Sequence, residues 1–371
     1  MTDLAGLSED GSLETCFRCH AVKRELEPGY LAGEEDFESH YSVGVHLVGE
    51  ASFFPDGRIR SFGYQLNHRF SDCYLSGRMT CVSCHEPHSQ GYWDVFERPL
   101  ESPLDDGQCL GCHASKAADP ESHTRHPPDT DGARCVSCHM PYRQQPNVGE
   151  RIPYARSDHT ISIPRPGVDE ALGLRSACSL CHGEMSPAQA RVHTEEWYGD
   201  TKPLRPVVEG LMAVETSSGA SPSRAEAARL LLHPETDHPL AQIAALNRFV
   251  EGYLVPGSGP LEPEVRNPLE RLARYPDPDL RGFALAVLHL TAGGGRPPVD
   301  PRSVSPDVRA RWAASLEFLA EGFRRRGGIR ATLETYRRAA ELSPRDADVL
   351  LGLASALQQA GDADEALGTY G

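Results

Sequence analysis

The chain has no long apolar run and no excess of basic residues. Among its 371 residues, no stretch approaches the about 18 consecutive apolar residues that span a bilayer. Lys and Arg number 37 against 53 Asp and Glu, which gives a formal net charge of -16. Nucleic acids and anionic membranes attract basic surfaces, so we expect neither as a partner. The first ten residues also lack the basic start and apolar core of a secretory signal.

Cysteine is absent from the second half of the chain. All eleven cysteines lie before residue 182, and the remainder becomes rich in Ala, Leu, Arg and Glu. A chain of this length accommodates two or three domains. The change in composition therefore predicts two structural regimes.

Five copies of the pattern Cys-x-x-Cys-His fall within the first 182 residues. They are Cys16, Cys19 and His20; Cys81, Cys84 and His85; Cys109, Cys112 and His113; Cys135, Cys138 and His139; and Cys178, Cys181 and His182. This pattern is typical of c-type haem attachment. The two thiols can reach the two vinyl groups on one porphyrin edge, and the next residue offers an imidazole as the proximal iron ligand. The sequence therefore predicts five covalently bound haem c groups.

Two other uses of cysteine explain the pattern less well. A zinc ribbon also has Cys-x-x-Cys pairs, but it needs two pairs or a histidine pair for each metal, and it requires no His after every second Cys. A disulfide framework would leave the five histidines unexplained. Only Cys73 lies outside the motifs, and we expect it to be a buried small residue.

Each haem iron has a second axial position, and the group that fills it separates electron transfer from catalysis. Eight further histidines lie in or beside the motif region: His40, His46, His68, His88, His123, His126, His159 and His193. Eight candidates for five positions make bis-histidine coordination feasible at every iron. His123 and His126 are alternatives before the fourth motif. His88 follows its own motif too closely to return to the same iron.

The domain organisation follows from composition and periodicity. Residues 1–200 are rich in Gly, Pro, Asp and His, which predicts irregular structure with short helices and a core completed by porphyrins. Prolines and a Ser-rich run predict a linker over 201–222. A helical, HEAT-like region is expected over 223–300, with Ser223 as an N-cap. Its expected helices are 224–232, 239–253, 262–274 and 279–290.

Residues 301–371 contain a repeat at a spacing of thirty-four residues, which is the tetratricopeptide period. The recurring pairs include Leu319 and Leu353, Ala320 and Ala354, Gly327 and Gly361, and Tyr336 and Tyr370. A coiled coil or a generic helical bundle is the alternative. A repeat needs a stacked neighbour to cover its apolar face, so we expect the array to continue beyond Gly371. The expected fold class is mainly α with extensive irregular structure: a loop-rich pentahaem cytochrome c domain followed by an α-helical repeat solenoid.

The stretch from Cys16 to about Tyr198 resembles the multihaem c-type cytochromes of the doubled-CXXCH kind that carry C-terminal tetratricopeptide repeats. The order and spacing of the matching segments agree over about half of the chain, and the helical C-terminal region agrees in type. The matching segments are 14–20, 37–41, 81–89, 135–141, 158–160 with 163–166, and 178–182 with 197–199.

The distal iron ligands that the resemblance implies are His40, His88, His126 and His159. Many relatives carry a histidine shortly before the second motif, where this chain has Ser76 and Gly77. The fifth distal ligand would therefore be His68 or His46, and we take His68 as the candidate. Relatives also have an earlier segment with further haem motifs, so we expect the N-terminus to be incomplete or processed.

We expect an exported, periplasmic or extracellular electron carrier rather than an enzyme. Five haems in near contact would exchange electrons with other redox proteins or cytochromes, and the helical repeats would dock a protein partner. The alternative is a multihaem oxidoreductase that acts on a small nitrogen or sulfur compound at an iron with an open axial site. A third alternative is an assembly scaffold with structural haems. The sequence leaves homo-oligomer formation open.

Overall fold

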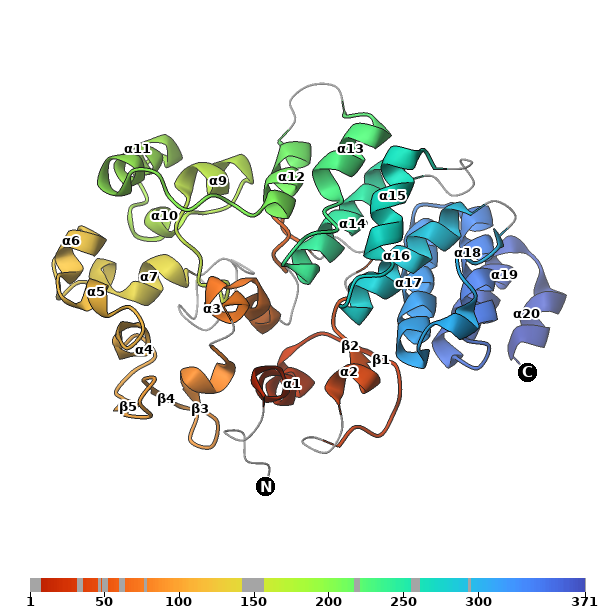
Figure 1. The fold of residues 1–371 in the computed structure, drawn as a ribbon, viewed down its shortest axis with the longest axis horizontal. Coiled ribbons are helices and arrows are strands. Elements are labelled where there is room, and N and C mark those ends of the chain that lie inside the picture. Colours follow the sequence, from red (N-terminus) through yellow and green to blue (C-terminus); the bar gives the residue numbers. More distant parts are fainter. Residues whose placement is uncertain are drawn as a thin grey trace. The chain divides into compact units, whose positions relative to one another are not determined.

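The structure is a computed structural model that describes residues 8–31, 36–45, 48, 53–59, 64–76, 79–141, 157–216, 221–254, 261–292 and 295–370. The chain divides into two compact units. The first comprises Met1–Ala21, Leu31–Phe37 and Ile59–Pro203, and the second comprises Val22–Tyr30, Glu38–Arg58 and Leu204–Gly371. In the described residues, helices predominate and the strands are short (Figure 1). The predicted mainly-α class is therefore confirmed.

The first unit is built from short helices and turns. Its helical segments are α1 (Glu9–His20), η3 (Tyr64–Phe70), α3 (Asp72–Leu75), η4 (Cys81–Ser83), α4 (Gly107–Leu110), α5 (Ala114–Ala117), α6 (Pro120–Thr124), η5 (Asp131–Ala133), α7 (Cys135–His139), α9 (Pro166–Ala171), α10 (Ala177–Cys181) and α11 (Pro187–Tyr198). The strands β3 (His85–Glu86), β4 (Gly91–Trp93) and β5 (Pro99–Leu100) form an antiparallel sheet in that order. Ser186 starts α11 with a reciprocal capping box to Gln189.

Apolar burial is uneven along this first unit. Near its start, Leu13 and Phe17 of α1 are fully buried, as are Ile59 and Leu66. Within the described residues 79–141 and 157–203, the buried apolar side chains are only Val136, two prolines and three alanines: Pro141, Pro166, Ala133, Ala177 and Ala190. A segment of this length normally needs large aliphatic and aromatic side chains to offset its conformational entropy. Most of the first unit therefore has almost no apolar core made by its own side chains.

The second unit is a succession of longer helices. They are α12 (Pro206–Glu215), α13 (Arg224–Leu231), α14 (Pro239–Tyr253), α15 (Pro263–Leu272), α16 (Pro278–Thr291), η7 (Pro301–Ser303), α17 (Pro306–Arg325), α18 (Ile329–Leu342), α19 (Ala347–Ala360) and α20 (Ala363–Tyr370). The unit also includes the antiparallel pair β1 (Arg24–Glu25) and β2 (Tyr41–Ser42), and most of α2 (Phe37–His40). The four helices predicted between 224 and 290 are confirmed as α13 to α16, within two residues at each end.

Each of these helices packs on the next or the next but one along the chain (Figure 1). Helices α14, α16 and α17 bury the largest apolar side chains, including Phe249, Phe283 and Trp312. Gly327, just after α17, and Gly361, just after α19, have φ of 77° and 88°. Glycine adopts this left-handed conformation freely, and it ends a helix there. The two glycines that the sequence places thirty-four residues apart therefore end two helices in the same way.

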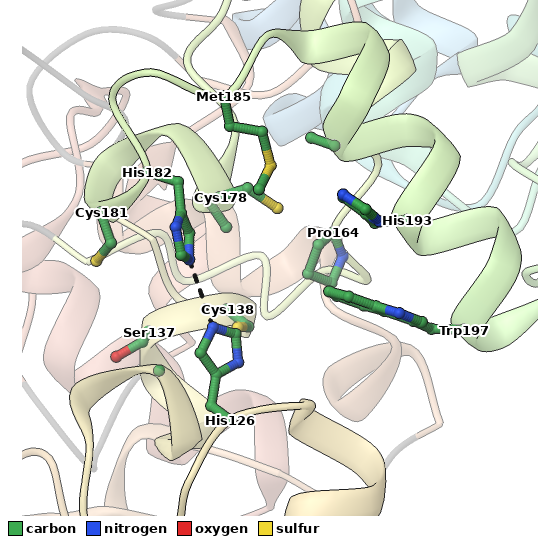
Figure 2. A pocket seen from close by; sticks show the side chains of 13 residues that line it. His126, Ser137, Cys138, Pro164, Cys178, Cys181, His182, Met185, His193 and Trp197 are labelled. Carbon is green, nitrogen blue, oxygen red and sulfur yellow. Dashed lines mark hydrogen bonds between the residues drawn. The ribbon is translucent and has the colours of Figure 1, made fainter.

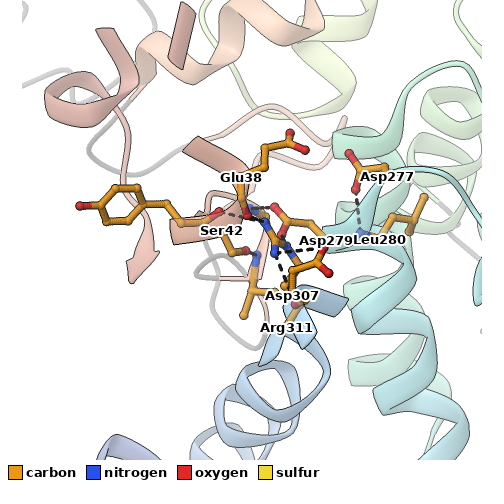
Figure 3. A network of polar contacts seen from close by, with 10 residues as sticks. Glu38, Ser42, Asp277, Asp279, Leu280, Asp307 and Arg311 are labelled. Carbon is orange, nitrogen blue, oxygen red and sulfur yellow. Dashed lines mark hydrogen bonds and ion pairs between the residues drawn. The ribbon is translucent and has the colours of Figure 1, made fainter. Parts of the chain in front are cut away.

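A buried ion pair attaches residues 38–44 to the helices of the second unit (Figure 3). The Arg311 side chain is 1% exposed, and its Nε donates to Asp279 Oδ1 at 2.6 Å. Its Nη2 donates to the backbone carbonyls of Glu38 and Tyr41. Asp279 Oδ2 accepts from the Gly44 backbone N–H at 2.7 Å. Because Arg311, Asp279 and Gly44 are buried and each has a partner in it, the network fixes the segment against α16 and α17.

The predicted linker over 201–222 is wrong at its centre, where α12 forms. Pro206 occupies the first turn of α12, where the N–H that proline lacks has no helical partner in any case. Val207, Leu211 and Val214 are buried on one face of α12, which packs on α13 and α14. The predicted first domain, 1–200, also contains two segments, 22–30 and 38–58, that the structure assigns to the second unit.

Candidate functional site

All five Cys-x-x-Cys-His motifs lie on or beside short helices of the first unit. The fourth motif forms the whole of α7, the first motif ends α1, and the fifth begins in α10 with His182 as its C-cap. Cys81 begins η4, and Cys109 lies in α4. On a helix, positions i, i+3 and i+4 share one face. The motif spacing therefore presents both thiols and the imidazole on the same side of α7 and at the end of α1.

Side-chain caps hold these short helices. The Ser176 hydroxyl accepts from the Ser179 backbone N–H at 3.2 Å and begins α10. The Thr80 and Ser83 side chains form a reciprocal capping box at η4. Asp106 Oδ1 accepts from the Cys135 backbone N–H at 2.8 Å, where α7 begins. A cap of this kind satisfies donors that the first turn leaves without a partner, so the starts of the second, fourth and fifth motifs are fixed by side chains.

Three of the five motif histidines each face a second histidine. The ring centres of His85 and His159 are 6.4 Å apart, with an interplanar angle of 18°. For His139 and His123 the separation is 6.2 Å and the angle is 7°. For His182 and His126 the separation is 5.8 Å and the angle is 40°. Each pair joins a motif histidine to a histidine outside the motifs.

These separations suit two imidazoles bound to opposite sides of one metal ion. With a metal–nitrogen bond of about 2 Å and roughly 1.1 Å from the nitrogen to the ring centre, the centres would lie about 6.3 Å apart. The Nε2 atoms of His126 and His182 are 3.5 Å apart. That distance is longer than an ordinary N–H hydrogen bond of about 2.7–3.2 Å. It is slightly shorter than the about 4 Å that an intervening metal ion requires.

Backbone carbonyls orient one imidazole in each pair. His126 Nδ1 lies 2.6 Å from the Thr124 carbonyl oxygen, His139 Nδ1 lies 3.1 Å from that of Ser162, and His159 Nδ1 lies 2.8 Å from that of Ser157. A carbonyl can only accept, so Nδ1 carries the proton and Nε2 keeps its lone pair for a metal. Burial also lowers the pKa of His139, and it lowers that of His159 to about 4, so both imidazoles are neutral at pH 7.

The fifth motif lines a small cavity (Figure 2). Its two thiols and His182 lie on one side of the cavity and His126 lies on the other, with the two imidazoles directed at one another. Pro164, Met185 and Trp197 contribute apolar walls. The cavity has a volume of about 70 Å³. Two thiols, two imidazoles and an apolar wall are the groups that a covalently attached haem requires.

Successive motifs are neighbours in space through their thiols. The Cys16 thiol is hydrogen-bonded to that of Cys81, and this bond lowers the pKa of Cys16 and raises that of Cys81. The Cys109 thiol is bonded in the same way to that of Cys135, with a lowered pKa at Cys109 and a raised pKa at Cys135. The first motif therefore adjoins the second, and the third adjoins the fourth.

The remaining two links join the second motif to the third and the fourth to the fifth. Burial raises the pKa of Cys84 to about 12, and the nearby thiol of Cys109 adds to the rise. Burial raises the pKa of Cys138 to about 11, and the thiols of Cys178 and Cys181 add to that rise. The five motifs thus follow one another in space in the order of the sequence.

His20, His113 and His88, all from the predicted ligand set, face no second imidazole within the part of the chain that the structure describes. His20 ends α1, and its Nδ1 lies 3.5 Å from Gln65 Nε2. His113 is exposed beside α5. His88 is exposed in the turn between β3 and β4, where its backbone N–H donates to Glu86 Oε1. The predicted role of His88 as a distal ligand stays a prediction.

The other predicted distal ligands differ in orientation. His40 belongs to the second unit, and its Nδ1 donates to the Glu27 carbonyl at 2.9 Å, as in the paired histidines. His68 is 5% exposed and uses Nε2, which lies 2.9 Å from the Met79 carbonyl oxygen. In this orientation the nitrogen of His68 that remains for a metal is Nδ1, and its role as the fifth distal ligand stays a prediction. His46 lies outside the described residues.

The pairing of His123 is the functional feature that the predicted ligand set missed. A spacing of three residues places His123 and His126 on one face if the helix continues. Instead, α6 ends at Thr124, and Arg125 adopts a left-handed conformation with φ of 59°. This turn sends His123 to His139 and His126 to His182. The sequence indicates this possibility only in that two histidines, His123 and His126, precede the fourth motif.

No three His, Cys, Asp or Glu side chains converge to hold a single metal ion among the residues with described positions. A tetrahedral zinc site takes four protein ligands, whereas a haem iron takes two axial ones. Among the described residues, the three facing histidine pairs are therefore the groups that could bind a metal ion. Within the same residues, no helix has the length and apolar character to cross a membrane.

Comparison of the sequence with protein-family models and with curated proteins, and comparison of the fold with solved structures, found no match.

Proposed function

We propose that this chain is an electron-transfer protein that binds five c-type haems through its Cys-x-x-Cys-His motifs. The ten motif cysteines would form the thioether bonds, and the five motif histidines would be the proximal iron ligands. His126, His123 and His159 would be the distal ligands at the fifth, fourth and second motifs. The haem iron, when bound, supplies reversible one-electron chemistry.

The observation that carries this proposal is the set of three facing histidine pairs. Each pair combines one motif histidine with one other histidine at a separation that suits bis-imidazole ligation. In each pair, a carbonyl holds one ring so that Nε2 is available. Two strong axial ligands leave no position for a substrate, which favours electron transfer over catalysis.

Two further observations support it. From the second motif to the fifth, the described part of the chain buries almost no large apolar side chains of its own, as expected if flat apolar cofactors occupy its interior. The thiols of consecutive motifs are neighbours, which would bring five attached cofactors close together in sequence order. Such an order provides an entry at one end of the series and an exit at the other.

The second unit supports a proposal of its own. Its helices from α12 to α20 make their main contacts, among the described residues, with near neighbours in the chain, which is typical of a HEAT-like and tetratricopeptide solenoid. We infer that it docks a protein partner, such as another cytochrome, and that the family resemblance extends to this region. Export to the periplasm or the cell exterior follows from covalent haem attachment.

The first test is the cofactor content. Expression with a periplasmic leader in a host that matures c-type cytochromes should give a red protein whose mass exceeds that of the polypeptide by five haems. Its reduced spectrum should show low-spin c-type bands. A colourless product with free thiols, or one with fewer than five haems, would contradict the proposal.

The second test uses the cavity of the fifth motif. Replacing His126 with alanine should convert one iron of five from low spin to high spin, which is about one fifth of the low-spin signal in quantitative electron paramagnetic resonance. His193 is the matched control, because it lines the same cavity but stacks on Trp197 at 5.3 Å. H193A should leave the low-spin signal unchanged. Equal effects of the two substitutions would count against the assignment of His126.

The second candidate function is oxidation or reduction of a small nitrogen or sulfur compound. It is favoured by His20 and His113, which face no second imidazole in the described regions of the chain. An iron ligated only by one of these histidines would keep a position open for substrate. Binding of cyanide or carbon monoxide by the unmodified protein, at up to two sites per chain, would distinguish this candidate from an all-low-spin carrier.

A further inference from the structure

A cavity of about 620 Å³ lies in the second unit between α15, α16 and the segment that follows α16. The α16 residues that line it, Arg281, Leu285 and Leu288, recur at intervals of four and three. That spacing places them on one helix face. Pro298, Val299, Ser303 and Val304 of the segment 295–304 complete the wall. Cavities of about 300–1,000 Å³ are the usual size for small-molecule sites.

The charge in this cavity is positive, in a chain whose net charge is -16. Arg266 is neutralised by Glu270, with Nε 2.6 Å from the carboxylate. Arg274 and Arg281 line the same cavity, and neither forms an ion pair with a described residue. The Nε of Arg281 is buried and has no hydrogen-bond acceptor there. A buried guanidinium donor without an acceptor is a position that an anion would satisfy.

Most of the remaining lining residues are apolar, and Thr291 and Ser303 are the polar ones among them. Leu285 and Leu288 are 1% and 9% exposed, and Val299 is 40% exposed at the open side. A ligand that matches both parts therefore needs one anionic head and an apolar body. A carboxylate suits the planar fork of arginine, which can donate two parallel hydrogen bonds to its two oxygens.

We propose that this cavity binds an amphiphilic monocarboxylate, with its head on Arg281 and Arg274 and its apolar chain on Leu285, Leu288 and Val299. This site is separate from the motif region and does not depend on the proposed electron-transfer function. It is built from residues of the second unit alone.

The test is isothermal titration of the full chain with decanoate, below the concentration at which decanoate forms micelles. We expect saturable binding of one equivalent. Decanol has the same chain without the charge and should bind at least tenfold more weakly. The double variant R274Q/R281Q should also lose at least tenfold in affinity for decanoate. The variant V299W, which fills the open side without changing the charge, should abolish binding.

The matched control is R330Q, which removes a 93% exposed arginine of α18 outside the cavity. It should leave the affinity for decanoate unchanged, and thermal unfolding of each variant establishes that it is folded. Absence of saturable decanoate binding would overturn the proposal. Equal affinity for decanol and decanoate, or an effect of R330Q equal to that of R274Q/R281Q, would overturn the role of the two arginines. Unchanged binding by V299W would exclude this cavity as the site.

Discussion

Replacing Arg311 with methionine should destabilise the second unit by about 4 kcal/mol. The substitution keeps an apolar side chain of similar length but removes the guanidinium from a site where its side chain is 1% exposed. Among the described residues, Asp279 then keeps the Gly44 N–H as its hydrogen-bond donor, and the carbonyls of Glu38 and Tyr41 lose the bond from Arg311. Breaking a buried ion pair by removal of one partner costs about 3–5 kcal/mol. Stabilities of whole domains are about 5–15 kcal/mol.

The assay is urea denaturation followed by circular dichroism, which the helices of the second unit dominate. Hydrogen exchange of the segment 38–45 provides a local readout, because that segment loses its attachment to α17. The variant D279N/R311M removes both charges, and it should recover about 2 kcal/mol or more relative to the sum of the single variants. The control R330Q removes a fully solvated arginine and should change stability by less than about 0.5 kcal/mol.

Two results would refute this reasoning. If R311M lost less than about 1 kcal/mol, the buried pair would not be a main attachment of the segment. If the effects of the D279N and R311M substitutions were additive, the two side chains would not be energetically coupled, although they are 2.6 Å apart.

Two further predictions concern the same unit. Burial raises the pKa of Glu317 to about 7, against the opposing charge of Arg24, so the folded protein holds a proton that the unfolded chain releases above about pH 4.5. Stability should therefore fall by up to about 3 kcal/mol as pH rises from about 4.5 to above 7, and E317Q should flatten this dependence in urea titrations at pH 5 and pH 8. A Cβ at Gly352 would lie 2.4 Å from the buried Tyr336 ring, so G352A should cost about 1–3 kcal/mol. Gly368 has nothing within 4 Å of an added Cβ, so G368A should be neutral or stabilising by up to about 1 kcal/mol; equal thermal shifts for the two variants would contradict the packing argument.

Local patterns were sufficient to predict helices α13 to α16 of the second unit. Helix α14 begins and ends at the predicted residues, and Ser223 caps α13 as predicted, with its hydroxyl accepting from the Glu226 N–H. Helix α12 was missed because Pro206 suggests a loop, although proline also suits the first turn of a helix. The inclusion of residues 38–58 in this unit could not be predicted. It depends on contacts such as Gly44 with Asp279, which are 235 residues apart and have no local signature.

In the candidate site, too, some features could be predicted from the sequence and others depend on distant contacts. The motif residues follow from the spacing alone, and the concentration of histidines identified a set that contains all three facing partners. Which partner meets which motif could not be predicted, because it depends on the left-handed turn at Arg125 and on the carbonyls that orient each ring. The tautomer of His68 could not be predicted from the sequence either. It depends on a contact between Nε2 and the carbonyl of Met79, eleven residues later in the chain.

The facing histidines and the small buried residues of the motif region have one common explanation. Ala133, Ala177 and Ala190 are buried where an ordinary domain would bury Leu or Phe. Ala177 and Ala190 line the cavity beside His126 and His182, and these two rings are too far apart for a normal hydrogen bond between them. A protein interior is close-packed, so such space is stable only if another group fills it. A flat apolar cofactor that accepts one imidazole on each face would fill that space and supply the missing apolar area. This requirement supports haem more directly than the motif pattern, because it follows from packing and not from the spacing of the cysteines.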